Sequence, residues 1–97
     1  MTEKTSVTVR IAGEEHTIRA SAQPDYTRKC AKLVDDRIHE IRLAAGVVDG
    51  QKAAILAALS IADEYFQAYE ELERAQVELA ARVEALAAHV EGALPLP

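Results

Sequence analysis

The sequence predicts an α+β fold in which an N-terminal β-hairpin and a short helix pack on the start of a long C-terminal helix that forms a coiled coil. Three patterns in the 97 residues predict it. Apolar and polar residues alternate over residues 7–11 and again over 16–19, as in paired strands. Residues 53–62 are apolar except for Ser60, and a mostly apolar series with steps of three and four runs through residues 69–90.

The predicted hairpin has β-branched residues at alternate positions of residues 7–11. Gly13 interrupts this pattern within a short loop at residues 12–15, and residues 16–19 resume it. A two-stranded hairpin by itself is marginal in water, so it should pack on the helices. Its edge is also suited to pairing with the same hairpin of a second subunit.

The first helix is expected to run from Pro24 to about Ala44. Proline suits a first helical turn, and Asp25 complements the positive end of the helix dipole. Gly46 should end the helix in the left-handed conformation. The apolar stripe of this helix comprises Tyr26, Cys30, Leu33, Val34, Ile38 and Ile41.

The second helix should begin at Gly50, with Asp49 as its N-cap, and continue to about Glu91. A helix that is apolar on all sides, as at residues 53–62, must be covered all around. This block is too short to cross a bilayer, which takes ~20 residues. The cover must therefore be protein, and because the rest of so small a chain supplies only part of it, we expect self-association.

The series from Tyr69 to Val90 has the 3.5-residue period of a coiled coil. Gln76 interrupts it at an a position, where it either sets the register or is a tolerated imperfection. Val at a and Leu at d favour two parallel strands. We expect a head domain at residues 1–66 and a coiled-coil tail at residues 67–97. The expected oligomer contacts are Leu56, Leu59, Phe66, Tyr69, Leu72, Gln76, Leu79, Val83, Leu86 and Val90.

The net charge of −5 is unevenly distributed. Residues 1–52 hold nine Lys or Arg against eight Asp or Glu, whereas residues 53–97 hold two against eight. The acidic tail argues against a nucleic-acid partner, since affinity for phosphates depends on clustered cations. The first ten residues lack the apolar core of a signal peptide, so we expect a cytoplasmic protein with no membrane partner. The single cysteine allows no intrachain disulfide.

Cys30 and His39 are the only residues that suggest nucleophilic catalysis. Nine positions along one helix place them on opposite faces, so they cannot form a dyad within one subunit. Cys30 is expected to be a buried apolar thiol. A cluster of Asp35, Asp36, His39 and Glu40 could ligate a divalent metal, but such clusters are more often a solvated helix face. We therefore expect no enzyme, no catalytic residue, no metal and no cofactor.

Basic residues of the head are the candidate binding groups. Scattered Lys and Arg usually serve solubility, but here nine of the eleven lie in the head, and a basic head on an acidic tail suits an acidic partner. Arg37 differs, because Asp36 and Glu40 flank it and suggest weak surface ion pairs. The candidates are Arg42, Arg10, Lys52, Arg19, Arg28, Lys29 and Lys32.

The segments VTVRIAGEEHTIRA, KCAKLVDDRIHEIR and DGQKAAILAALSIADEYFQA, followed by a coiled-coil tail, resemble the ZapA family of bacterial cell-division proteins. The resemblance covers roughly residues 7–90. It is sharpest in the hairpin pattern V-x-I-x-G at residues 9–13, the Asp-Arg pair at residues 36–37, and LAALSI at residues 56–61.

The resemblance implies a protein that binds filaments of FtsZ, the tubulin-like GTPase of the division ring, and cross-links or bundles them at mid-cell. It implies dimers joined through their heads and tetramers joined by antiparallel tails. Because Val at a and Leu at d favour parallel strands instead, parallel and antiparallel pairing of the tails both stay open. In the family, charged residues near the hairpin turn and the end of the first helix contact the filament, and Arg42 matches a basic position there. The acidic turn Glu14–Glu15 and the uncharged residues 44–48 depart from that pattern.

A second hypothesis is a small acidic dimeric adaptor or antitoxin-like regulator, whose tail wraps a partner protein. This hypothesis predicts a tail that is disordered until it binds. An oligomeric scaffold instead predicts a tail that is helical in isolation.

Overall fold

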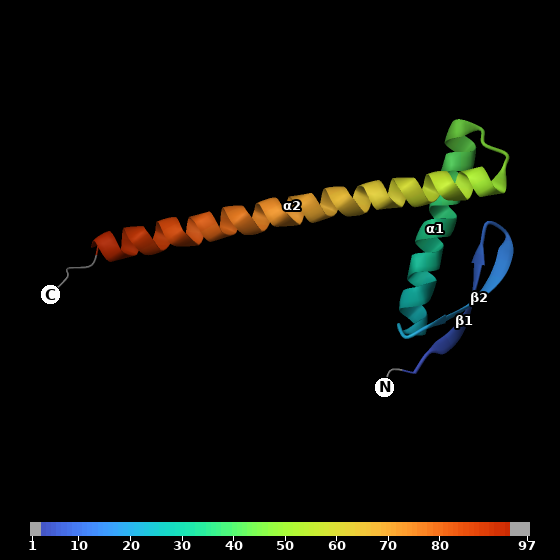
Figure 1. The fold of residues 1–97 in the computed structure, drawn as a ribbon, viewed down its shortest axis with the longest axis horizontal. Coiled ribbons are helices and arrows are strands. Elements are labelled where there is room, and N and C mark those ends of the chain that lie inside the picture. The colour runs from blue at the N-terminus through green and yellow to red at the C-terminus, as the bar shows by residue number, and fades with distance from the viewer. Residues whose placement is uncertain (1–2, 94–97) are drawn as a thin grey trace. The chain divides into compact units, whose positions relative to one another are not determined.

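The computed structural model describes residues 3–93. The elements, in order, are β1 (Thr5–Ile11), β2 (Glu14–Ala20), α1 (Pro24–Ala45) and α2 (Gly50–Ala93) (Figure 1). The predicted α+β class and the predicted order of elements are confirmed.

The chain divides into two compact units, Met1–Ile61 and Ala62–Pro97, which we call the head unit and the tail unit. Helix α2 begins in the head unit and forms the described part of the tail unit. The domain boundary expected between residues 66 and 67 stays a prediction. Residues 94–97 of the expected tail, like residues 1 and 2 of the expected head, lie outside the described residues.

Strands β1 and β2 form an antiparallel hairpin in which Ile11 lies opposite Glu14 beside the turn. The turn is Ala12 and Gly13, with φ angles of 55° and 80°. Positive φ at both central residues is typical of a type I′ turn, whose twist suits a two-residue hairpin loop. The hairpin is confirmed, but the loop is shorter than the expected residues 12–15 because β2 already begins at Glu14.

Both ends of α1 form as the sequence predicts. Pro24 lies in its first turn, and the Thr27 N–H donates to the Gln23 carbonyl at 3.1 Å. The helix ends at Ala45, one residue beyond the expected end. Gly46 follows with φ of 62°, the left-handed conformation that satisfies the last carbonyls of a helix.

Asp49 is the N-cap of α2, as predicted. Its Oδ1 accepts hydrogen bonds from the main-chain N–H groups of Gln51 at 2.9 Å and Lys52 at 3.5 Å. Its carbonyl accepts from the Ala53 N–H at 3.0 Å. These bonds satisfy orphan donors of the first turn, and α2 then continues to Ala93, slightly beyond the expected Glu91.

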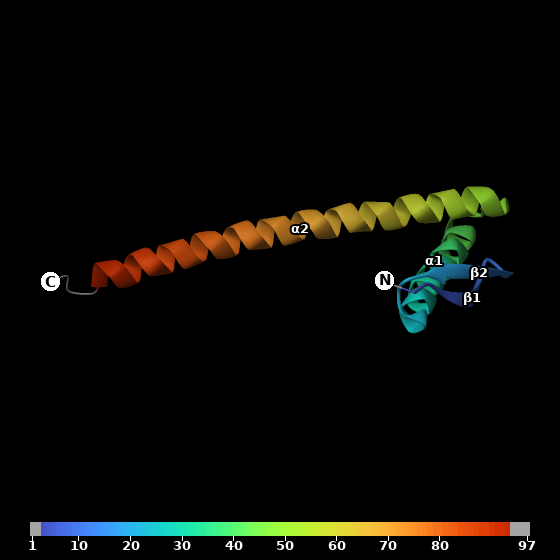
Figure 2. The same ribbon diagram turned by 60° about the horizontal axis from the view of Figure 1, so that its bottom comes forward.

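Two small apolar clusters form the core of the head unit. Where the hairpin lies against α1 (Figure 2), the buried residues are Val7, Val9 and Ala31. Between α1 and the start of α2, the buried residues are Ile38, Ala53 and Ala57. Ile11 packs against both clusters and joins them. The buried residues of α2, among those whose burial is described, are both alanines, and the small alanine side chain lets α1 and α2 approach closely.

This core is thin. No large side chain is fully buried anywhere in residues 3–93. Within the apolar block at residues 53–62, Ile55 remains 53% exposed and Leu59 62% exposed. The chain thus covers only the alanine face of this block, and a substantial apolar surface is left for another protein chain.

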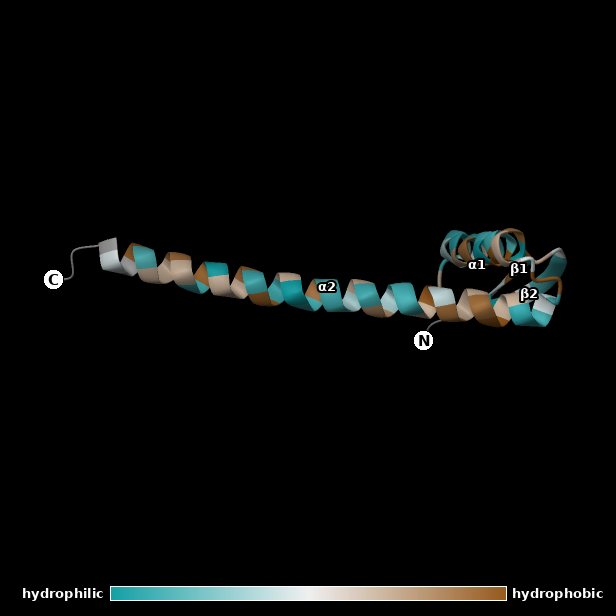
Figure 3. Cartoon of the chain, turned by 90° about the horizontal axis from the view of Figure 1, so that it is seen from above, coloured by the Kyte–Doolittle hydropathy of each residue, from teal (hydrophilic) through white to brown (hydrophobic). Residues whose placement is uncertain are grey.

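The described part of the tail unit is α2 from Ala62 to Ala93. Tyr65 packs edge-on against Phe66 with ring centroids 5.3 Å apart, and it stacks on Tyr69 at 6.3 Å. Figure 3 shows apolar residues concentrated at the start of α2 and alternating with polar ones along the rest. Among residues 3–93, neither helix by itself is both long enough and apolar enough to span a membrane. Helices α1 and α2 reach that length and hydropathy only when they are taken together as a pair bent by 111°.

Candidate functional site

Three of the seven candidate cations form ion pairs with carboxylates in the head unit. The pairs, with N–O distances of 4.0, 3.0 and 2.8 Å, are Arg10–Glu15, Arg28–Asp25 and Lys32–Asp36. All six side chains are more than half exposed, so water screens these pairs and they add little stability. The hydrogen bond from Lys32 to Asp36, and then the negative charge of Asp36, raise the pKa of Lys32.

The other four candidates are Arg42, Lys52, Arg19 and Lys29. Within residues 3–93 none of them has an ion pair. Lys52, Arg19 and Lys29 are exposed on α2, β2 and α1 respectively, whereas Arg42 is half-buried. Their charges are not neutralised by the head unit itself, so a partner can use them.

Arg42 has the most unusual surroundings of the four. Its Nε is buried and has no hydrogen-bond partner. Its Nη2 lies only 2.9 Å from the place where a Cβ on Gly50 would stand. Glycine at position 50 therefore gives the guanidinium room against the first turn of α2. A buried, unsatisfied donor is costly.

Two hollows of about 450 and 340 Å³ adjoin at Arg42. The first is bounded by the hairpin turn and by α1, including Asp35, Asp36 and His39. The second is bounded by β2 and the start of α2, including His16. Ala12 and Ile38 line both. The structure thus places the first candidate, Arg42, in a groove that begins beside the hairpin turn.

Asp35 holds this turn against α1. Its Oδ1 accepts a hydrogen bond from the Ala12 main-chain N–H at 2.8 Å. The sequence predicted only a solvated carboxylate on the helix face. The missed signal is the loop composition, because a two-residue loop of Ala and Gly forces positive φ on a residue with a Cβ, and that strain needs support from elsewhere.

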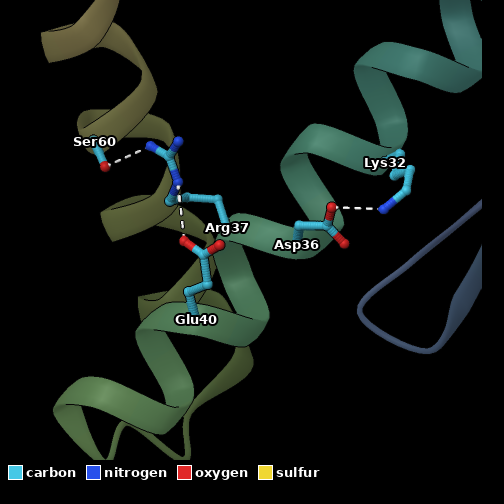
Figure 4. Close-up of polar contacts among 5 residues, drawn as sticks. All are labelled: Lys32, Asp36, Arg37, Glu40 and Ser60. Atoms are coloured by element: carbon cyan, nitrogen blue, oxygen red, sulfur yellow. Dashed lines mark hydrogen bonds and ion pairs between the residues drawn. The ribbon is translucent and has the colours of Figure 1, made fainter.

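The interpretation of Arg37 as a member of weak surface ion pairs is correct only in part, because Arg37 does pair with Glu40 but does not lie at the surface. Its side chain is only 15% exposed, and its Nη1 donates to Ser60 Oγ on α2 at 2.8 Å (Figure 4). Its Nε lies 3.6 Å from Glu40 Oε2, whereas Asp36 pairs with Lys32 instead. The physical reason is helical geometry, since a step of one residue turns Arg37 toward α2 and Asp36 away from it.

Two flanks of α1 border the hairpin, and they differ in chemistry. The apolar flank carries Tyr26, Cys30 and Val34, which together with Ile18 of β2 line a hollow of about 300 Å³. The charged flank carries Arg28, Lys32 and Asp35, which together with Thr8 and Arg10 of β1 line a hollow of about 260 Å³.

The expectation that Cys30 is buried is also wrong, because its side chain is exposed. The residues that the hairpin and α2 cover are Thr27, Ala31 and Ile38, and the apolar stripe of α1 is wider than this covered strip. Cys30 lies beside it, on the apolar flank. His39 lines the hollow at the turn instead, so the structure does not bring Cys30 and His39 together.

The expected oligomer contacts fall into two groups. Leu56 is half-buried, and the other nine are exposed. The apolar seam residues of the tail are each between 46% and 63% exposed in the single chain. Within the described residues, no group of three or more His, Cys, Asp or Glu side chains has an arrangement that could hold a metal ion.

Comparison with known proteins identifies the family. Residues 7–90 match the family model described as "Cell division protein ZapA". The cell division protein ZapA of Geobacillus thermodenitrificans is 41% identical over 76 residues, which cover 78% of this chain and 84% of that protein. The ZapA of Bacillus subtilis is 31% identical over 77 residues, covering 79% and 91%.

Two solved structures are similar to this one. A ZapA mutant dimer from Geobacillus stearothermophilus aligns with a TM-score of 0.65 and 40% identity, covering 82% of this chain and 95% of that one. A conserved Pseudomonas aeruginosa protein described as unknown aligns with a TM-score of 0.72 and 25% identity, covering 89% and 96%. Taken with the family match over most of its length, these similarities establish that the chain belongs to the ZapA family of cell division proteins.

Proposed function

We propose that this protein binds FtsZ filaments through its head unit and cross-links or bundles them, so that it promotes assembly and stability of the Z-ring at mid-cell. Membership of the ZapA family makes it a cell division protein and not an enzyme. The proposal adds the partner and the mechanism to that role.

The observation that carries the proposal is the state of Arg42. Among the candidate cations it alone combines a buried, unpartnered nitrogen with a position between two hollows. A carboxylate on the filament surface would pair with the guanidinium of Arg42 and neutralise its charge. Lys52, also without an ion pair, stands two residues beyond Gly50 and adds positive charge to the same end of the head unit.

Self-association would supply the multivalency that cross-linking requires. The apolar flank of α1, the exposed side of the block at residues 53–62 and the seam of the tail unit all leave apolar surface uncovered. We propose that a second copy covers the first two and that further copies cover the seam, as a dimer and then a tetramer. The dimeric state of the similar Geobacillus stearothermophilus protein supports the first step. Several weak head contacts on one particle would then hold neighbouring filaments together.

The alternative of an adaptor or antitoxin-like regulator is less well supported. It predicts a tail that orders only on binding, whereas α2 is helical through Ala93 in the single chain. A helix that carries its own exposed seam fits a scaffold whose tails associate with one another.

The test is co-sedimentation with FtsZ from the same organism in the presence of GTP, with light scattering to detect bundles. The wild-type protein should pellet with the filaments and raise the scattering. Arg42→Glu should weaken both effects by about tenfold or more, because it replaces a charge-assisted contact with repulsion. Its mass in solution should equal that of the wild type.

The matched control is Arg74→Glu, which makes the same change of charge at an outward-facing position of the tail unit. It should bundle filaments like the wild type. Equal loss in both variants would mean that net charge, and not the Arg42 site, drives binding. Failure of the wild type to pellet with filaments at any salt concentration would refute the proposed function itself.

A further inference from the structure

We propose that the contact between Arg37 and Ser60 sets the angle at which α1 lies on α2, and that it thereby holds Arg42 in its groove. Arg37 is then a positioning residue for Arg42 and does not itself touch a filament. The effect on filament binding rests on the proposed function, whereas the effect on the surroundings of Arg42 can be measured on the protein alone.

Helix α2 meets α1 along one face within the head unit. The residues of this face follow one another at steps of three, four and three, which keeps them on one side of a helix: Gly50, Ala53, Ala57 and Ser60. The two alanines in the middle are fully buried, and they pack with Ile38 of α1. The alanine pair is therefore the centre of the contact between the two helices.

Two arginines of α1 contact α2 on either side of this centre. Arg42 Nη2 lies 2.9 Å from the place of a Cβ on Gly50, and Arg37 Nη1 donates to Ser60 Oγ at 2.8 Å (Figure 4). The two contacts are about 15 Å apart along α2. A rotation of α1 that breaks the contact at Ser60 therefore also moves Arg42, by about 1 Å for each rotation of about 10°.

The alanine contact holds the helices together but fixes their angle only weakly. The hydrophobic effect has no direction, and alanine side chains are too short to interlock as larger side chains do. A hydrogen bond from a planar guanidinium is directional. Ser60 is the one polar residue in the block at residues 53–62, and Glu40 Oε2 lies 3.6 Å from the Nε of the largely buried Arg37 side chain. These polar contacts supply the restraint on angle that the alanines lack.

Arg42 depends on this angle because it fits closely. Its Nε is shut off from solvent, and its guanidinium leaves no room for a Cβ on Gly50. A rotation that opens the gap would admit water to Nε, and the opposite rotation would press the guanidinium against the first turn of α2. Either movement takes the cation from its place between the two hollows, so that binding must order a mobile side chain.

The first test uses the protein alone, with isotopically labelled arginine and NMR detection of the side-chain Nε–H groups. Exchange of the Arg42 Nε–H with water should be slow in the wild type, because the atom is buried. Ser60→Ala removes the acceptor of Arg37 and puts a better helix former in its place. This variant should speed exchange at Arg42 Nε by about tenfold or more, while the main-chain amides of Ala53 and Ala57 still exchange slowly.

The matched control is Ser6→Ala, which removes a hydroxyl group from an exposed residue of β1 and should leave exchange at Arg42 unchanged. The amides of the alanine pair separate positioning from general stability. If they speed up as much as Arg42 Nε in Ser60→Ala, the serine stabilises the head unit as a whole, and the positioning role is refuted.

The second test is a double-mutant cycle in co-sedimentation with FtsZ filaments. Ser60→Ala alone should weaken filament binding by about threefold or more, with the mass in solution unchanged. In the Arg42→Gln background it should cause no further loss, because the cation that it positions is already gone.

The outcomes distinguish this role from the proposed function. Unchanged exchange at Arg42 in Ser60→Ala, or an equal loss of binding in both backgrounds, would overturn the positioning role and leave the proposed function intact. A wild-type protein that does not bind filaments would refute the proposed function, and the exchange measurement would still decide whether Ser60 positions Arg42.

Discussion

The main-chain N–H of Ala12 donates a hydrogen bond to Oδ1 of Asp35 at 2.8 Å, across 23 positions of sequence. Ala12 has φ of 55°, a conformation that costs a residue with a Cβ about 1–2 kcal/mol. The helix α1 therefore stabilises a strained hairpin turn directly. Since the turn also borders the groove at Arg42, this one contact links the fold of the hairpin to the shape of the candidate site.

Replacing Asp35 with Ala should lower the free energy of unfolding by about 1 kcal/mol, because the Ala12 N–H loses a charged acceptor. Urea denaturation at fixed protein concentration measures this change. Asp36→Ala removes a neighbouring carboxylate that pairs only with exposed Lys32, so it should have the smaller effect. The opposite ranking would mean that the Asp35 contact does not hold the turn.

Replacing Ala12 with Asn should stabilise the protein by roughly 0.5–1 kcal/mol, because Asn adopts positive φ more readily and Asn-Gly is the preferred type I′ pair. Thermal unfolding followed by circular dichroism would show a higher Tm. The same substitution at exposed Thr17, in the middle of β2, should destabilise, since Asn is disfavoured in strands. A lower Tm for the Ala12 variant would contradict the type I′ assignment.

Replacing Gly50 with Ala should weaken FtsZ binding without lowering stability. The new Cβ would lie 2.9 Å from Arg42 Nη2, so the guanidinium must move out of its present place. Alanine favours the helix over glycine by up to about 1 kcal/mol, so unfolding should not become easier. Co-sedimentation measures the filament binding of this variant, and urea denaturation of the same sample measures its stability. Unchanged filament binding would show that the position of Arg42 does not matter.

The pair of Lys32 and Asp36 should make stability depend on pH at the alkaline end. The pKa of Lys32 is raised above its ordinary 10.5 by the hydrogen bond and charge of Asp36. Its stabilising contribution is therefore fully present below pH 10.5 and is lost as the pH rises through the higher folded-state pKa. The difference in unfolding free energy between the wild type and Lys32→Gln should be constant near about pH 8 and shrink above pH 10.5. A difference that grows with alkaline pH would contradict the pair.

Replacing Leu79 with Glu should lower the mass of any assembly that forms through the tail seam, because it would bury an unpaired charge. Light scattering at several concentrations measures this mass. Ala81→Glu adds the same charge at an exposed position outside the seam, so its mass should match the wild type. If both variants keep the wild-type mass, the seam residues do not mediate assembly.

Local patterns explain why so much of the fold could be predicted. The ends of α1 and the start of α2 follow from Pro24, Gly46 and Asp49, whose preferences depend on the backbone within a few residues. The hairpin follows from the alternation of apolar and polar residues on both sides of Gly13. The exposed seam of α2 likewise follows from a repeat that one helix displays without any help from the rest of the chain.

The candidate site depends on relations that no local pattern contains. The seven cations look alike in sequence, but three of them meet carboxylates, and Arg42 is half-buried because Gly50 leaves it room. Cys30 and Arg37 share one helix with the buried residues, yet one is exposed and the other reaches Ser60 on α2.

The sequence by itself determined the secondary structure, the ends of the helices, the apolar block and the seam, because these depend on periodicity and on residues within one or two turns. Only the tertiary structure decided that Asp35 supports the Ala12 turn, and that the two edges of the hairpin lie over chemically opposite flanks of α1. The physical reason is that the hairpin crosses α1 at an angle and offset set by packing of Val7, Val9 and Ala31. A shift in that packing would bring different side chains of α1 beside each strand.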